Sequence, residues 1–110
     1  MKGRDVIRRY KSGKRDFSRT RLRKAKLAGA DLREINLSWA YMRGANLRDA
    51  NLTGANLMGA DMVGVDLRQA DLSDSILHGA NLYKAEVTES QLAQAESLDG
   101  TIMPNGTRHK

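Results

Sequence analysis

Apolar residues recur at every fifth position from Arg15 to Gln94. This stretch divides into sixteen groups of five, and the third residue of every group is apolar. Ten groups have Ala two residues before that position, and ten have Asn or Asp directly before it. Six of the ten glycines stand at the fifth position. The third residues are Phe17, Leu22, Leu27, Leu32, Leu37, Met42, Leu47, Leu52, Leu57, Met62, Leu67, Leu72, Leu77, Leu82, Val87 and Leu92.

A period of five fits neither a regular helix nor a flat strand. On an α-helix, each step of five advances about 140° beyond a full turn, so the leucines would point to all sides. On a straight strand, successive leucines would alternate between the two faces. A chain that turns equally after every group keeps each Leu facing one axis, and Gly, Asn and Asp suit such turns. The pattern therefore predicts stacked coils around a Leu and Ala interior.

The iterated A-[DN]-L-x-x motif, as in Ala45 to Asp61, resembles the pentapeptide repeat family. The resemblance covers residues 15–94. It implies an all-β solenoid, a right-handed quadrilateral β-helix with four groups per coil and about four coils. The N-terminal helix and the ending around Met103 and Pro104 resemble small members common in photosynthetic bacteria, so we expect a bacterial protein.

We expect three segments: a basic capping helix at 1–14, the repeat at 15–94, and an irregular coil, turn and tail at 95–110. Val6, Ile7 and Tyr10 share one helical face, and Asp5 and Gly13 suit the ends of a short helix. Arg15 is expected to splay from the open end of the first coil. After Leu92 the register slips by one residue, which predicts that the coil is bulged or ends near 95–97. Residues 101–107 read as a final turn, and 108–110 as a frayed end.

Composition leaves little material for catalysis. The absence of Cys excludes disulfides, thiol chemistry and cysteine–zinc sites, and the two histidines, His78 and His109, show no metal-ligand spacing. The aspartates before the leucines suit hydrogen bonds to the local backbone. We therefore predict no enzyme activity, no cofactor and no metal. No apolar run is long enough to span a bilayer, and no signal peptide is seen, so we expect a cytoplasmic protein without membrane contact.

With four groups per coil, every fourth group stacks on the same face. The first face carries the groups centred on Phe17, Leu37, Leu57 and Leu77. The second carries those centred on Leu22, Met42, Met62 and Leu82. All large apolar residues at outward positions fall on these two faces, and we call them the apolar surface. They predict a protein-binding scaffold, although ladders that only stabilise the coils would use the same residues. The apolar surface comprises Trp39, Tyr41, Met58, Val63, Ile76 and Tyr83.

The net charge of +6 is unevenly distributed. Residues 1–26 hold twelve basic and two acidic side chains, whereas residues 49–99 hold two basic and nine acidic ones. Two alternative functions follow: contact of the basic end with nucleic acid or an acidic partner, and mimicry of DNA by the acidic stretch against an enzyme such as gyrase. We expect a monomer or weak head-to-tail self-association. The basic cap comprises Arg4, Arg8, Arg9, Lys11, Lys14, Arg15, Arg19, Arg21, Arg23, Lys24 and Lys26.

Overall fold

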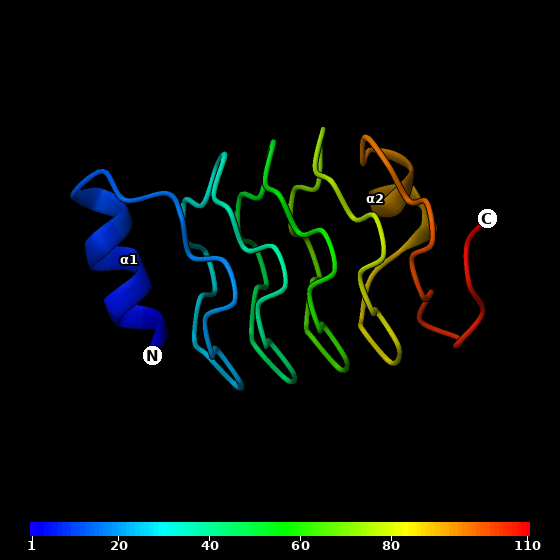
Figure 1. The fold of residues 1–110 in the computed structure, drawn as a ribbon, viewed down its shortest axis with the longest axis horizontal. Helices are drawn as coiled ribbons and strands as arrows, with labels where there is room; N and C mark the ends of the chain where they lie inside the picture. The colour runs from blue at the N-terminus through cyan, green and yellow to red at the C-terminus, as the bar shows by residue number, and fades with distance from the viewer.

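The computed structural model describes residues 1–110, which form a rod of 37 × 23 × 23 Å. Helix α1, Gly3–Lys11, covers one end, and helix α2, Glu89–Ala93, lies beside the other (Figure 1). Between them, parallel bridges join residues twenty apart, from Asp16 and Asn36 to Asp66 and Glu86. Four groups of five therefore make one coil, and successive coils stack through their backbones.

Each group of five builds the same small structure. The apolar third residue points inward, and its carbonyl oxygen accepts a hydrogen bond from the N–H three residues later, as from Ala25 to Leu22 at 3.0 Å. The fifth residue has a positive φ, which is characteristic of a type II turn and explains the glycines there. Backbone bonds then reach the next coil, such as Leu22 N–H to the Tyr41 oxygen at 2.7 Å. The repeat thus satisfies its own polar backbone while turning by a constant amount.

The interior is a single column of apolar side chains, all of them aliphatic or Met except Phe17. Twenty-eight buried hydrophobic residues form one cluster, and fifteen of the sixteen predicted inward residues belong to it. The exception is Val87, which is partly buried. The alanines two residues before the inward residues are also buried, and so are Ile35 and Val65 at the same position. The close-packed interior therefore accepts mostly small and occasionally branched side chains there.

Helix α1 closes the N-terminal end with the predicted face, since Val6 is buried and Ile7 and Tyr10 pack against the core. The predicted start is wrong by a few residues: the helix begins at Gly3, and Asp5 lies inside its first turn, accepting a bond from Lys2 N–H at 3.2 Å. Gly3 permits the close docking, because a Cβ there would lie 2.1 Å from the Lys26 carbonyl oxygen.

The C-terminal end departs from the repeat. The expected sixteenth group is replaced by α2, and the bridges beyond it join residues 21 apart, Ile76 with Ser97 and Asn81 with Ile102. The one-residue slip was predicted, but the helix was not. Thr88 starts the helix by accepting a bond from Gln91 N–H.

Residues 103–107 make the expected turn, with Gly106 N–H bonded to the Met103 oxygen at 2.8 Å. The predicted fraying of 108–110 is wrong for two residues. Arg108 bridges Ile102 in antiparallel fashion, and His109 N–H donates to the Thr101 oxygen at 2.7 Å. This short return strand covers part of the last coil. Neither helix has the length and apolar character required to cross a membrane.

Candidate partner-binding surface

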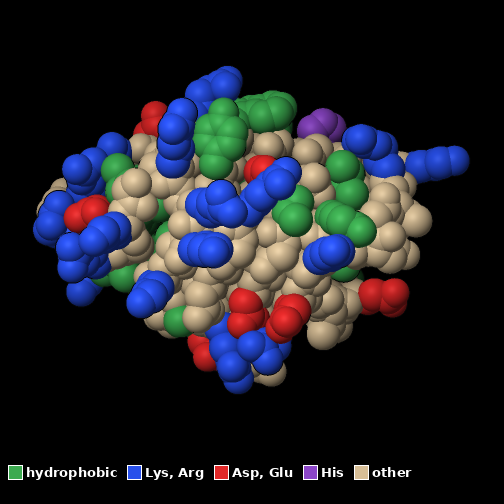
Figure 2. All heavy atoms as spheres, turned by 90° about the horizontal axis from the view of Figure 1, so that it is seen from below, with side chains coloured by type: hydrophobic (Ala, Val, Ile, Leu, Met, Phe, Trp, Pro, Cys, Tyr) green, Lys and Arg blue, Asp and Glu red, His purple; other side chains and the backbone are tan.

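The outward apolar residues differ in exposure. Trp39, Tyr41 and Tyr83 are 49%, 53% and 42% exposed, whereas Met58, Val63 and Ile76 are half-buried. Figure 2 shows hydrophobic side chains interspersed with Lys and Arg on one side of the rod, and basic side chains dense at the α1 end. The apolar surface therefore consists of three exposed aromatic side chains and three flatter aliphatic contacts.

Trp39 stands at a turn position with a φ of 59°. Seven other residues that are not glycine share this left-handed conformation, and all of them are charged or polar. Its indole lies across the turn of the next coil, because a Cβ built on Gly59 would fall 2.4–2.5 Å from three atoms of the six-membered ring. Because Gly59 has no side chain, the ring can lie flat against the backbone of the next coil. On the preceding coil, the Arg19 guanidinium lies 6.0 Å from the indole centroid.

The first face continues beyond Trp39 toward the C-terminus. Trp39 N–H donates to the Met58 oxygen at 2.8 Å, and Gly59 N–H donates to the His78 oxygen at 2.9 Å. Met58 and Ile76 line a shallow depression of about 450 Å³ with His78, Leu98 and neighbouring polar residues. Three of the six predicted residues, Trp39, Met58 and Ile76, therefore lie along one continuous face.

The second face is more strongly charged near Tyr41. Tyr41 forms parallel bridges with Arg21 on one side and Asp61 on the other. Asp61 also holds the Arg43 guanidinium at 2.7 Å. Arg21 is exposed and forms no ion pair, so the surroundings of Tyr41 carry net positive charge.

Tyr83 lies apart from the Trp39 and Tyr41 pair. Its ring is close to the C-terminal turn, where a Cβ on Gly106 would be 3.5 Å from the ring, and Lys84 Nζ is 5.3 Å from its centroid. Val63 lies one coil earlier, since Gly64 N–H donates to the Tyr83 oxygen. The apolar surface consequently divides into a Trp39 region and a smaller Tyr83 region.

Sequence reasoning missed the residues that support Trp39. Gly59 follows Trp39 by one coil of twenty residues, so the stacking of coils could have identified Gly59 as the residue that the indole packs on. Two other residues of the surface were also missed: Arg43, which pairs with Asp61 beside Tyr41, and Leu98, which lines the depression. Arg43 follows Arg23 by the same twenty residues. Leu98 was hidden because α2 adds a residue before it.

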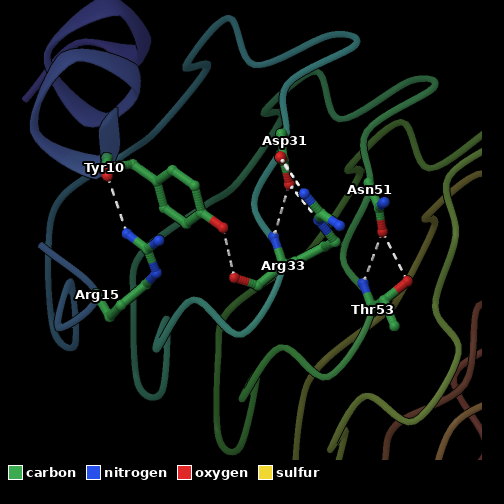
Figure 3. Close-up of polar contacts among 6 residues, drawn as sticks. All are labelled: Tyr10, Arg15, Asp31, Arg33, Asn51 and Thr53. Atoms are coloured by element: carbon green, nitrogen blue, oxygen red, sulfur yellow. Dashed lines mark hydrogen bonds and ion pairs between the residues drawn. The ribbon is translucent and has the colours of Figure 1, made fainter. Parts of the chain in front are cut away.

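All eleven residues of the basic cap are exposed, and only Arg8 forms an ion pair, with Asp5 at 3.4 Å. Arg15 does not splay from the end as expected. Its guanidinium lies 3.7 Å from the centroid of the Tyr10 ring and donates a hydrogen bond to the backbone carbonyl oxygen of Tyr10 at 2.9 Å (Figure 3). Tyr10 in turn donates to the Arg33 oxygen at 2.6 Å. Arg15 therefore serves to hold α1 on the first coil.

The carboxylates before the leucines are engaged in turns. All ten Asn and Asp side chains at this position accept a bond from the N–H two residues later, as Asn51 does from Thr53 (Figure 3). The Ser18 hydroxyl and N–H favour the charged form of Asp16 and lower its pKa, and the Ser73 hydroxyl and N–H do the same for the pKa of Asp71. The Arg68 guanidinium lowers the pKa of Asp66 to about 2. No group of three His, Cys, Asp or Glu side chains is placed to hold a metal ion.

Comparison with known proteins identifies the repeat. The pentapeptide repeats family model matches eight copies over residues 16–38, 35–74 and 60–96. No curated protein matches significantly. A solved pentapeptide repeat protein from the thylakoid lumen of Arabidopsis thaliana is 32% identical, with a TM-score of 0.66. That match covers 81% of this chain and 58% of the Arabidopsis chain.

Two solved proteins from the cyanobacterium Nostoc are also similar. HetL, which is involved in the regulation of heterocyst differentiation, is 35% identical with a TM-score of 0.45, over 86% of this chain and 51% of its own. A second Nostoc pentapeptide repeat protein is 37% identical with a TM-score of 0.48, over 93% and 75%. With the repeat matched over most of its length, this chain belongs to the pentapeptide repeat family.

Proposed function

We propose that the protein is a non-enzymatic scaffold, a right-handed quadrilateral β-helix of about four coils that binds a protein partner through the apolar surface. In this proposal, residues 1–14 form the basic capping segment, 15–94 the repeat that presents the surface, and 95–110 the C-terminal closure. The binding residues are Trp39, Tyr41, Met58, Val63, Ile76 and Tyr83.

The conformation of Trp39 carries the proposal. A left-handed backbone costs an L-residue about 1–2 kcal/mol, and Trp39 is the one large apolar side chain among the eight residues other than glycine that adopt it. The indole is 49% exposed there, so most of its apolar area lies outside the core. Such strain is typical of residues retained for a function, and Trp is enriched among residues that dominate binding energy.

The test replaces Trp39 with Gly and Tyr41 with Ser. Because Gly adopts a positive φ freely, we expect the Trp39→Gly change to alter the free energy of unfolding by less than about 1 kcal/mol. Immobilised wild type and double variant are then compared for proteins retained from a lysate of the source organism. The matched control is Gln69→Gly, since Gln69 has the same backbone conformation and lies on the third face, centred on Leu27, Leu47 and Leu67.

We expect a protein retained by wild type and Gln69→Gly to be lost from the double variant, while thermal unfolding of all three remains similar. Retention of the same proteins by the double variant would contradict the proposal. Unfolding of Trp39→Gly alone would show instead that the ring is a structural ladder.

The basic cap supports a second candidate, contact with nucleic acid or an acidic partner, because ten of its eleven cations have no carboxylate partner. Duplex binding that weakens steeply with salt would support it, and no binding at low salt would exclude it. DNA mimicry against gyrase ranks third. Asp61, Asp66 and Glu86 of the acidic stretch are ion-paired with arginines, which reduces the charge available for mimicry. A supercoiling assay with gyrase tests that candidate.

A further inference from the structure

The first face changes character steadily from the α1 end to the C-terminal end. Backbone bonds connect Arg19 to Ser38, Trp39 to Met58, Gly59 to His78 and Gly79 to Asp99, so these residues succeed one another coil by coil. The order outward from α1 is a cation, an aromatic ring, aliphatic side chains and then carboxylates. We name this path, from Arg19 to Asp99, the first-face track.

The basic end of the track has little acidic compensation. Arg19 and the nearby Arg21 are exposed and form no ion pair. The one carboxylate at this end of the face, Asp16, is held by the Ser18 hydroxyl and N–H at 2.6 and 3.0 Å. A bound segment would therefore meet positive charge beside Trp39.

The opposite end carries two carboxylates and one cation, since the Arg108 guanidinium donates to the Gly100 oxygen at 2.9 Å. The depression formed by Met58, Ile76 and Leu98 is also lined by Glu96 and Asp99, and no Lys or Arg lines it. Both carboxylates are exposed and form no ion pair. The aliphatic floor accepts apolar side chains, whereas its carboxylates would repel the phosphates of a nucleic acid.

We propose that the partner of the apolar surface binds the first-face track through a short extended segment with an acidic end, an apolar middle and a basic end. The acidic end lies by Arg19, the apolar residues lie on Trp39, Met58 and Ile76, and the basic end faces Glu96 and Asp99. Four coil steps of about 4.8 Å span about 19 Å, the length of about six extended residues. This inference rests on the proposed function and specifies the chemistry of its partner.

Trp39 is the only tryptophan in the chain, so its fluorescence reports on the track directly. The probes are end-blocked hexapeptides without aromatic residues: Glu-Glu-Leu-Leu-Lys-Lys, Lys-Lys-Leu-Leu-Lys-Lys, Glu-Glu-Leu-Leu-Glu-Glu and Ser-Ser-Leu-Leu-Ser-Ser. A thymidine hexanucleotide serves as the nucleic-acid probe. At physiological salt, we expect the dipolar peptide to bind about tenfold more tightly than the serine peptide, as expected of four exposed ion pairs. The dipolar peptide should also bind more tightly than the all-basic and the all-acidic peptide.

Charge reversal tests each end separately. Arg19→Glu cancels the positive charge of the nearby Arg21, so the dipolar and the basic peptide should then bind about equally tightly. Glu96→Lys with Asp99→Lys makes both ends basic and should transfer it to the acidic peptide. Arg48→Glu, the same charge change on the third face, should leave the dipolar peptide preferred. Circular dichroism and thermal unfolding confirm that each variant is folded.

Equal binding of the dipolar and serine peptides would overturn the track proposal, as would an unchanged preference in the reversed variants. Tighter binding of the hexanucleotide would overturn it in favour of nucleic acid. These results do not test the proposed function itself. That proposal is contradicted only if the variant with Trp39→Gly and Tyr41→Ser retains the captured protein.

Discussion

The hydroxyl of Ser75 is buried in the core and has no hydrogen-bond partner. Ser75 occupies a position that is Ala in ten groups, so its oxygen is desolvated without compensation. We expect Ser75→Ala to raise the free energy of unfolding by about 1 kcal/mol, measured by chemical denaturation.

Thr101 provides the matched comparison, because its equally buried hydroxyl donates to the Leu77 oxygen. Thr101→Val should lower stability by roughly 1 kcal/mol. A loss of stability in Ser75→Ala would show that the hydroxyl makes a useful contact.

Asp66 makes the stability of the fold depend on pH in the acidic range. The Arg68 guanidinium donates to its carboxylate at 2.8 and 3.0 Å and lowers its pKa to about 2. Since the unfolded value is about 3.9, this contribution is complete above about pH 4 and is lost as the pH falls toward 2. Asp66→Asn keeps the turn acceptor, as nearby asparagines do, and should therefore flatten the thermal stability profile between about pH 4 and 2.

The control is Asp74→Asn, which removes an exposed carboxylate that forms no ion pair. Its profile should remain as steep as that of the wild type. A wild-type slope in Asp66→Asn would show that the Arg68 pair does not contribute to folding.

Residue roles inside one group could be predicted from the sequence, and roles between coils were harder to predict. The turn bonds of Asn36 or Asp71 depend on neighbours two residues away, which the motif contains. The seat of Trp39 on Gly59 depends on a coil length of twenty residues, which the spacing of leucines alone does not define. The resemblance provided that length, but the pairing of individual side chains was not worked out from it.

At the scale of elements, α2 repairs the backbone where the repeat is interrupted. The Ala70 oxygen would receive its bond from the backbone of a regular sixteenth group, as the Ala50 oxygen does from Asp71 N–H. The Gln91 side-chain amide takes over this role and donates to the Leu67 and Ala70 oxygens at 2.7 and 2.9 Å. We expect Gln91→Ala to lower stability by about 1–2 kcal/mol and to increase hydrogen exchange around α2.

Gln94→Ala is the comparison for Gln91→Ala, since the exposed Gln94 side chain makes one long contact, 3.4 Å from the Ser73 hydroxyl. Equal protection of the amides around α2 from hydrogen exchange in both variants would contradict the bridging role of the Gln91 side chain. The sequence contains the signals for this helix, a Thr88 cap and Gln91 three residues later. They were overlooked because Leu92 continues the five-residue period and suggested one more group.

At the scale of the molecule, charge and shape lie along the same axis. The N-terminal 26 residues carry a net charge of +10, and residues 49–99 carry −7. The α1 end and the C-terminal end stand at opposite ends of the 37 Å axis (Figure 1). The overall basic charge therefore conceals a dipole between the α1 end and the acidic coils, while Arg108 and Lys110 add two positive charges at the C-terminal end. The basic end of one molecule matches the acidic coils of another.

This dipole predicts head-to-tail association at low salt. At about 10 mM salt the Debye length is about 30 Å, close to the length of the rod, whereas at about 150 mM it is about 8 Å. Sedimentation velocity should detect weak association at the lower salt concentration and a monomer at the higher one. Arg8→Glu with Arg9→Glu should abolish the association, because it removes charge from the basic end. Arg48→Glu with Lys84→Glu has the same net charge but leaves that end intact, so it should still associate. Association that is insensitive to salt, or lost equally in both variants, would contradict a dipolar origin.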